Sequence, residues 1–128
     1  MRLLLILFIL IGFNSSSADT FKDKVKQFET NIIFLRHALA PGVGDPVNFN
    51  LGNCRTQRNL NDVGRLQAKK IGQALQLNGI NFADIFSSEW CRCKETANLL
   101  DIGNWQTFGG LNSFFQNRSN RNHILHSL

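Results

Sequence analysis

Two groups of residues in this chain have the types and the placement that phosphate chemistry needs. Arg36 and His37 directly follow the apolar run at residues 31–35, and Arg92 lies shortly after a second apolar run that ends at Ser87. A neutral imidazole can attack phosphorus through a ring nitrogen, and its reference pKa of about 6.5 leaves it mostly neutral near pH 7. A guanidinium offers a planar fork of N–H donors to phosphate oxygens. These residue types predict covalent phosphoryl transfer through His37.

The two groups meet only if both apolar runs are parallel strands of one sheet. Residues 31–35 form a continuous apolar run with β-branched side chains, which is typical of a strand buried on both faces. We expect a second strand at residues 83–87 and a short third strand at residues 105–108. Helical crossovers between parallel strands bring the strands' carboxyl ends to one edge of the sheet. The sequence therefore predicts an α/β fold with a phosphate pocket at that edge.

The segment between the first two strands contains the clearest helix of the chain. Asn61 or Asp62 can cap its start, and Gly79 can end it in a left-handed turn. Helical spacing places most of its apolar side chains on one broad side, which we expect to be buried: Val63, Leu66, Ile71, Ala74, Leu75 and Leu77. A further helix is expected to open at Ser88 and Glu89, where backbone N–H groups favour a bound anion.

Residues 1–18 have the layout of a secretory signal peptide. A basic start, an apolar run too short to span a bilayer and small residues at Ser16 and Ala18 predict cleavage after residue 18. We therefore expect an exported protein, periplasmic or extracellular, with no stable membrane span after cleavage. A short amphipathic helix is expected at residues 20–28, and residues 19–128 are expected to form one domain. An uncleaved N-terminal anchor is the alternative.

Composition and cysteine spacing exclude several classes of function. The chain has 128 residues, is 43% hydrophobic and carries a formal charge of +5, which suits one globular domain with an anionic partner. Its basic residues are scattered, so no nucleic acid partner is expected. In an oxidising compartment Cys54 could bridge to Cys91 or Cys93, and three buried thiols are the alternative. The cysteine spacing lacks a second pair for zinc, and no metal or cofactor is expected.

Three motifs, in this order, resemble the histidine phosphatase superfamily, which is also called the phosphoglycerate mutase-like family. They are "FLRHALAPG", "LNDVGRLQAKKIG" and "FSSEWCRCKETANLL". The family patterns L-[TN]-x-x-G-x-x-Q-A and S-S-x-x-x-R-x-x-x-T-A fall on Leu60, Asn61, Gly64, Gln67 and Ala68, and on Ser87, Ser88, Arg92, Thr96 and Ala97. The resemblance is strongest over residues 31–100. It implies an exported bacterial-type member with a three-layer, Rossmann-like fold around a parallel sheet.

The resemblance also implies roles for individual residues. His37 would be the phosphorylated nucleophile, Arg36 and Arg92 would hold the phosphoryl oxygens, and Arg58 and Ser88 would bind the substrate. The residues themselves leave alternatives open. Arg92 could pair with an acid on its own helix, His37 could hydrogen-bond a loop carbonyl, and Arg58 could be solvated.

Other residues of the motifs suit positioning better than chemistry. The long loop at residues 38–59 contains both prolines and is expected to shape the substrate site. Gly64 and Gln67 are expected to serve helix packing and contact with the loop after the first strand.

Two parts of an active family member have no clear counterpart in this chain. Ser113 stands where the family usually has the glutamate that protonates the leaving group, and no carboxylate follows Asp101. The second histidine could only be His123 or His126, in an asparagine-rich tail at residues 118–128 that does not resemble the family. We therefore expect a chain that is truncated at its C-terminus relative to the family.

Two functions stay open from the sequence. The first is a phosphomonoester hydrolase of the histidine acid phosphatase type that acts through phosphorylated His37, with activity impaired by the missing acid and second histidine. The second is a non-catalytic module on the same fold that binds a phosphorylated small molecule or phosphate. A hydrolase is favoured over a mutase, while the substrate and the oligomeric state stay open.

Overall fold

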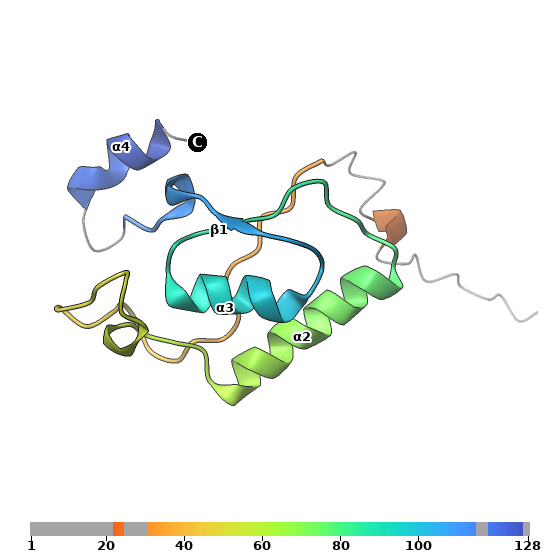
Figure 1. Ribbon diagram of the computed structural model, residues 1–128, viewed down its shortest axis with the longest axis horizontal. Helices are drawn as coiled ribbons and strands as arrows, with labels where there is room; N and C mark the ends of the chain where they lie inside the picture. Colours follow the sequence, from red (N-terminus) through yellow and green to blue (C-terminus); the bar gives the residue numbers. More distant parts are fainter. Residues whose placement is uncertain (1–21, 25–30, 115–117, 127–128) are drawn as a thin grey trace, which may run out of the picture.

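The computed structural model describes residues 22–24, 31–114 and 118–126. Its elements are α2 (Asp62–Leu77), β1 (Phe86–Ser87), α3 (Cys91–Leu100), β2 (Gln106–Thr107) and α4 (Arg121–Leu125), with 3-10 turns at Cys54–Thr56, Gly109–Leu111 and Arg118–Asn120 (Figure 1). The predicted signal peptide and most of the helix predicted at residues 20–28 lie outside the described residues. Within the described ranges, no helix is long and apolar enough to cross a membrane.

β1 and β2 are neighbouring parallel strands, and α3 is the crossover between them. Phe86 pairs with Gln106 in their register. The strands predicted at residues 83–87 and 105–108 are confirmed in position, although each has only two residues in the structure. Parallel strands joined by a helix are the defining unit of the α/β class. This pair places the residues after β1 and those after β2 at the same edge.

The strand predicted at residues 31–35 is wrong for this structure. These residues form no strand, and Ile32 and Phe34 are 64% and 81% exposed. An apolar run becomes a buried strand only when neighbouring strands satisfy its backbone N–H and C=O groups and other elements cover its faces. In the described ranges β1 pairs only with β2, and residues 31–35 do not join the sheet. The run therefore lacks the partners that its apolar pattern needs.

α2 begins and ends as predicted, but it buries a different face. Asn61 Oδ1 accepts the Gly64 N–H at 2.8 Å and caps the helix, and Gly79 follows its end at φ +62°. The buried positions of α2 share one helical face: Gly64, Ala68, Gly72 and Leu75. Among the six positions of α2 that were predicted to be buried, only Leu75 is buried in the structure. Val63, for example, is 62% exposed.

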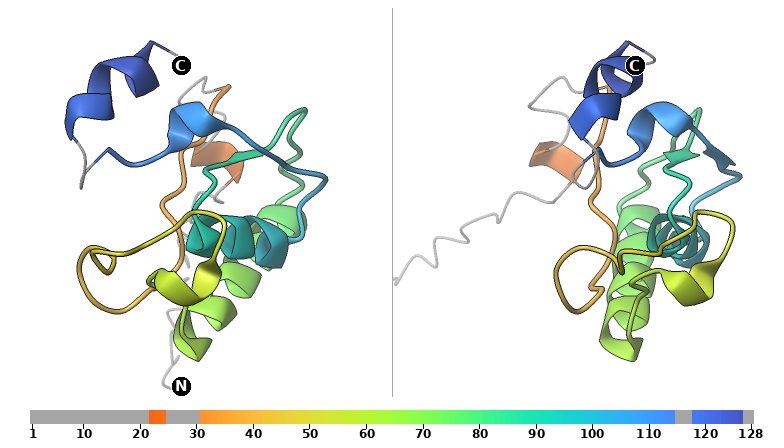
Figure 2. Two further views of the ribbon diagram at one scale, coloured as in Figure 1. Left: turned by 60° about the vertical axis from the view of Figure 1, so that its left-hand side comes forward. Right: turned by 90° about the vertical axis from the view of Figure 1, so that its left-hand side faces the viewer.

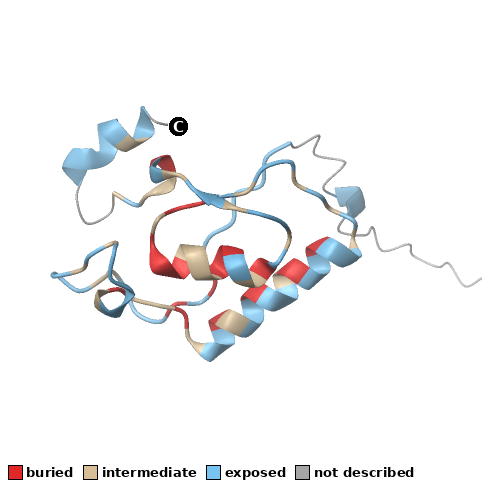
Figure 3. Ribbon diagram, in the orientation of Figure 1, coloured by how far each residue is buried: buried red, intermediate tan, exposed pale blue. Residues whose placement is uncertain are grey.

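The small residues of α2 allow very close contact with neighbouring backbone. A Cβ at Gly64 would collide with the backbone of Leu39, and a Cβ at Gly72 would collide with the carbonyl group of Leu100 at the end of α3. α2 and α3 therefore pack side by side, with buried residues along the line where they meet (Figure 3). Large side chains at these positions would hold the two elements apart. The central cluster is completed by small and medium side chains: Ala38, Ala40, Leu60 and Ala68.

α3 begins later than predicted, at Cys91, with Trp90 as an extended N-cap residue. The sequence predicts Glu89 in the first helical turn, but in the structure Glu89 lies before the helix begins. The reason is a pair of hydrogen bonds to a residue beyond β2. Asn112 Oδ1 accepts the Glu89 N–H at 2.9 Å, and Asn112 Nδ2 donates to Glu89 Oε2 at 2.5 Å. Glu89 thus links the start of α3 to the segment after β2 instead of capping the helix.

Candidate phosphate site

The loop at residues 38–59 folds back toward the start of α3 (Figure 2). A disulfide and a glutamine attach it to the first turn of that helix. Cys54 and Cys91 are bonded, with their Cα atoms 5.6 Å apart. Gln57 Oε1 accepts the Cys91 N–H at 2.9 Å, and Gln57 Nε2 donates to carbonyl oxygens within the loop. Cys93 is unbridged and half-buried, and burial raises the pKa of its thiol. The prediction that Cys54 bridges to one of the other cysteines is confirmed.

His37 is half-buried at the start of this loop, in a form that leaves one ring nitrogen available. Its Nδ1 lies 2.7 Å from the Ala38 carbonyl oxygen. A carbonyl oxygen only accepts, so Nδ1 carries the hydrogen and the lone pair of the neutral ring is on Nε2. Burial lowers the pKa of His37, and the positive charges of Arg92, Arg58 and Arg36 lower it further, against the opposing hydrogen bond to Ala38. The interpretation that His37 binds a loop carbonyl is thus confirmed, and it is compatible with a nucleophilic Nε2.

Arg92 forms a buried ion pair with Asp45, which lies in the loop. Its Nη1 donates to both carboxylate oxygens of Asp45, at 2.9 and 3.0 Å, and the two side chains are only 8% and 3% exposed. The guanidinium also lies over the Trp90 ring, 4.7 Å from its centroid. The alternative that Arg92 pairs with an acid on its own helix is therefore wrong. Asp45 of the loop holds Arg92 in place, and the charge of Arg92 contributes to lowering the pKa of His37.

Arg58 belongs to the same cluster and is not a solvated side chain. Its backbone N–H donates to Asp45 Oδ1 at 2.7 Å, and its Nε donates to the Gly44 carbonyl at 2.9 Å. A further hydrogen bond joins its Nη1 to the Ala40 carbonyl. Burial and the charge of Arg92 lower the pKa of Arg58, against the opposing charge of Asp45. Arg36 is exposed, and its charge also acts on both His37 and Arg58.

Ser88 is buried and makes a local hydrogen bond. Its Oγ accepts the Trp90 N–H at 3.3 Å. Thr96 has the more direct connection to His37, because its Oγ1 accepts the Ala38 N–H at 3.0 Å while donating to the Arg92 carbonyl at 2.7 Å. Thr96 therefore holds the residue after His37 against α3. The substrate-binding role expected for Ser88 stays a prediction.

The expected positioning role of α2 is confirmed. Gln67 Oε1 accepts the Leu39 N–H at 2.9 Å, and Gly64 packs directly on the Leu39 backbone. The two residues hold the loop immediately after His37 against the helix. These contacts explain why both residues belong to the motif without giving either one a chemical role.

Sequence reasoning missed Asp45 and Gln57, the two loop side chains that organise the cluster. Asp45 is the only carboxylate among residues 38–59 and stands in a Gly-Asp-Pro turn, where Asp commonly serves the backbone. That signal could have singled it out as a partner for the arginines. Gln57 is a buried amide in a loop, and nothing in its type or spacing distinguished it.

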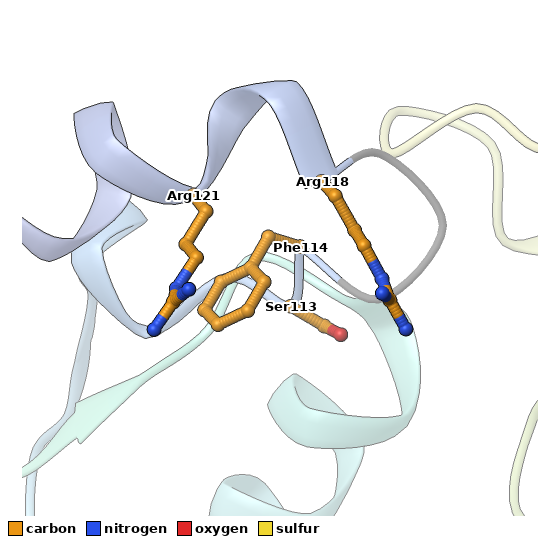
Figure 4. A pocket seen from close by; sticks show the side chains of 4 residues that line it. All are labelled: Ser113, Phe114, Arg118 and Arg121. Carbon is orange, nitrogen blue, oxygen red and sulfur yellow. The ribbon is translucent and has the colours of Figure 1, made fainter.

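The residues after β2 form a separate hollow of about 340 Å³, lined by Ser113, Phe114, Arg118 and Arg121. The two arginine side chains lie on either side of the Phe114 ring (Figure 4). His123 and His126 are exposed, and no contact among the described residues joins either of them to His37. The structure therefore brings together His37, Arg58 and Arg92, and it does not supply a second histidine to them.

Comparison with known proteins gives one match. The model of the histidine phosphatase superfamily (branch 1) matches residues 32–107, which is more than half of the chain and contains the whole cluster around His37. No curated protein and no solved structure matches this sequence. Membership in this family implies the α/β fold of phosphoglycerate mutase-like proteins, in agreement with the parallel pair and its helical crossover. The chain belongs to the histidine phosphatase superfamily.

Proposed function

We propose that the chain is a phosphomonoester hydrolase that acts through a phosphohistidine at His37. The observation that carries this proposal is the state of the imidazole. Its Nδ1 donates to the Ala38 carbonyl, and burial together with the charges of three arginines favours the neutral ring. A neutral imidazole with an available Nε2, next to guanidinium groups, is what attack on a phosphate dianion requires.

The proposed reaction has two steps. The Nε2 lone pair attacks phosphorus, the bond from phosphorus to the ester oxygen breaks, and the alkoxide or phenoxide leaves with the electron pair of that bond and takes a proton from solvent water. Water then attacks the phosphohistidine and gives a proton to the solvent, the N–P bond breaks, inorganic phosphate is released and the imidazole is regenerated. Arg92 and Arg36 would hold the non-bridging oxygens, whose charge must be stabilised in both steps, and Arg58 and Ser88 would bind the substrate.

The leaving group meets no carboxylic acid at position 113, where the chain has a serine. Ser113 cannot donate a proton as a carboxylic acid does, and general acid catalysis typically contributes a factor of about 10² to 10⁴. Esters of phenols leave as stabilised anions and need this proton less than esters of alkyl alcohols. We therefore expect the chain to hydrolyse aryl phosphates slowly and alkyl phosphates far more slowly.

A second function, a non-catalytic module that binds phosphate, is favoured by the arginine cluster together with Ser113. A phosphate-binding module needs the arginines but not an acid, and Ser113 leaves the reaction without one. Both functions use phosphorylated small molecules or phosphate as the ligand. Turnover separates them, because only the hydrolase releases the alcohol.

The proposal extends to location and fold. The disulfide supports export to the periplasm or outside the cell, since such bonds persist in oxidising compartments. A three-layer fold around the parallel sheet is proposed on family membership. Export is tested by isolating the protein from the natural cell fraction and sequencing its N-terminus. A mature chain that begins at Asp19 is expected, and an intact Met1 in the cytosol would contradict export.

The enzymatic proposal is tested with an aryl phosphate at acidic and neutral pH. We expect slow release of the phenol, lost in His37→Ala and unchanged in His123→Ala, a control histidine that is exposed in α4. No release by the wild-type chain, together with retained binding of inorganic phosphate, would favour the module. Release that His37→Ala leaves intact would refute both the nucleophile and its assigned site.

A further inference from the structure

Asp45 is the buried anion at the centre of the arginine cluster. One carboxylate oxygen accepts both the Arg58 N–H at 2.7 Å and the Arg92 Nη1 at 2.9 Å. The second oxygen accepts from the same Nη1 at 3.0 Å. The loop around this residue is shaped for the contact, since Gly42 and Gly44 adopt positive φ values of 91° and 70°. Asp45 is therefore held by the backbone in the position from which it contacts Arg92.

The contacts of Arg92 leave a defined part of its guanidinium for a ligand. Nη1 is used by Asp45 and by the Arg58 carbonyl, and Nε is buried without a partner among the described residues. Nη2 makes no hydrogen bond to the described residues and is not among their buried, unpartnered side-chain atoms. The Trp90 ring covers one face of the group. Nη2 is therefore the guanidinium nitrogen that is left to donate to a phosphoryl oxygen.

We propose that Asp45 is a positioning residue that fixes Arg92 for phosphate binding. This inference rests on the proposed function, in which Arg92 holds a phosphoryl oxygen. A free arginine side chain loses about 1.5–2 kcal/mol of rotamer entropy when a ligand immobilises it. In the structure Asp45 and Trp90 have already immobilised it. Removing Asp45 moves that cost to the binding step, which corresponds to roughly tenfold weaker binding of phosphate.

The test uses calorimetric titration of the full chain with inorganic phosphate. We expect Asp45→Ala to raise the Kd about tenfold, and Asp45→Asn to raise it less, because the amide oxygen still accepts from Arg92 and Arg58. Asp62→Asn is the matched control. It removes the same charge from a fully exposed side chain that pairs with Arg65 on α2, and its Kd should equal that of the wild type.

The melting temperature separates positioning from a purely structural role. If Asp45 only stabilises the loop, its variants melt earlier but bind phosphate with an unchanged Kd in the folded range, and the inference fails. Tighter binding would show that the carboxylate competes with phosphate, which also overturns it. Should Asp45→Ala fail to fold, Asp45→Asn decides between the same outcomes.

The proposed function fails separately from this inference. Wild-type phosphate binding that Arg92→Lys leaves unchanged removes Arg92 from the site, and no binding by the wild type removes the site altogether. Either result overturns the positioning role as well. By contrast, binding that depends on Arg92 but not on Asp45 overturns the positioning role alone.

Discussion

Breaking the disulfide between Cys54 and Cys91 should remove a large part of the chain's stability. The two cysteines are 37 residues apart in the sequence. For a loop of this length, the chain-entropy relation gives an unfolded-state entropy gain of about 13 cal/mol/K, or about 4 kcal/mol at 25 °C. Small domains are typically stable by about 5–15 kcal/mol, so this loss approaches the whole stability of a thinly built fold.

Urea unfolding, followed by circular dichroism, measures this effect. Cys54→Ser and Cys91→Ser should each lower the free energy of unfolding by a similar amount, because either one opens the same loop. With a urea dependence of about 2 kcal/mol/M, the midpoint moves down by roughly 2 M. Cys93→Ser is the matched control, since this thiol is unbridged, and it should cost about 1 kcal/mol or less.

The same variants connect stability to the site. Cys54 precedes Gln57 and Arg58 in the loop, so opening the bond loosens the segment that holds Asp45 beside Arg92. Phosphate binding should therefore weaken in Cys54→Ser, even where the variant is still folded. Equal unfolding free energies for Cys54→Ser and Cys93→Ser would refute the reasoning, because they would mean that the bond does not constrain the chain.

Two further predictions concern packing and pH. Gly72→Ala places a methyl group against the Leu100 carbonyl and should destabilise the fold by about 1–3 kcal/mol in the same urea assay. Gln73→Ala, the control at the exposed neighbouring position, should change the free energy of unfolding by no more than about 0.5 kcal/mol. Equal effects of the two substitutions would contradict the close packing at Gly72. Burial and the nearby arginines lower the pKa of His37, so its phosphorylation rate should fall only below the usual value of about 6.5. Arg36→Ala removes one of these charges and should move that acid limb to higher pH in rapid-quench measurements. An unchanged acid limb would show that the charge does not act on the ring.

The stability linked to His37 has a definite sign. Its pKa is lowered in the folded chain, so the unfolded chain binds this proton more readily. The folded state is therefore favoured above the unfolded value of about 6.5 and loses this contribution as the pH falls below it.

Local signals predicted α2, α3 and part of the sheet, but not the short helix α4. Asn61 and Gly79 mark the ends of α2 by chemistry that acts within a few residues, and both marks are correct. The positions of β1 and β2 were predictable for the same reason. The structure of residues 31–35 was not predictable in this way, because a strand needs partner strands that are distant in the sequence. The composition of the run does not say whether those partners are present.

The residues of the site were likewise predictable in part. His37 and Arg92 were recognisable because their types and spacing follow the motif, and the structure places them in one electrostatic cluster. Asp45 could not be assigned to Arg92 from spacing, since a long loop must fold back to bring them together. The prediction of which face of α2 is buried was wrong for a related reason. Close contact between backbones requires glycine, whereas amphipathic spacing assigns burial to larger side chains.

Chemical trapping of the phosphorylated protein tests the central claim most directly. The wild-type chain is mixed with an aryl phosphate, quenched in alkali, in which phosphohistidine is stable, and mapped by peptide mass spectrometry. We predict one phosphoryl group on His37, labile to acid, absent from His37→Ala and reduced in Arg92→Ala. A phosphoryl group on another residue, or turnover of the aryl phosphate by His37→Ala at the wild-type rate, would contradict the account.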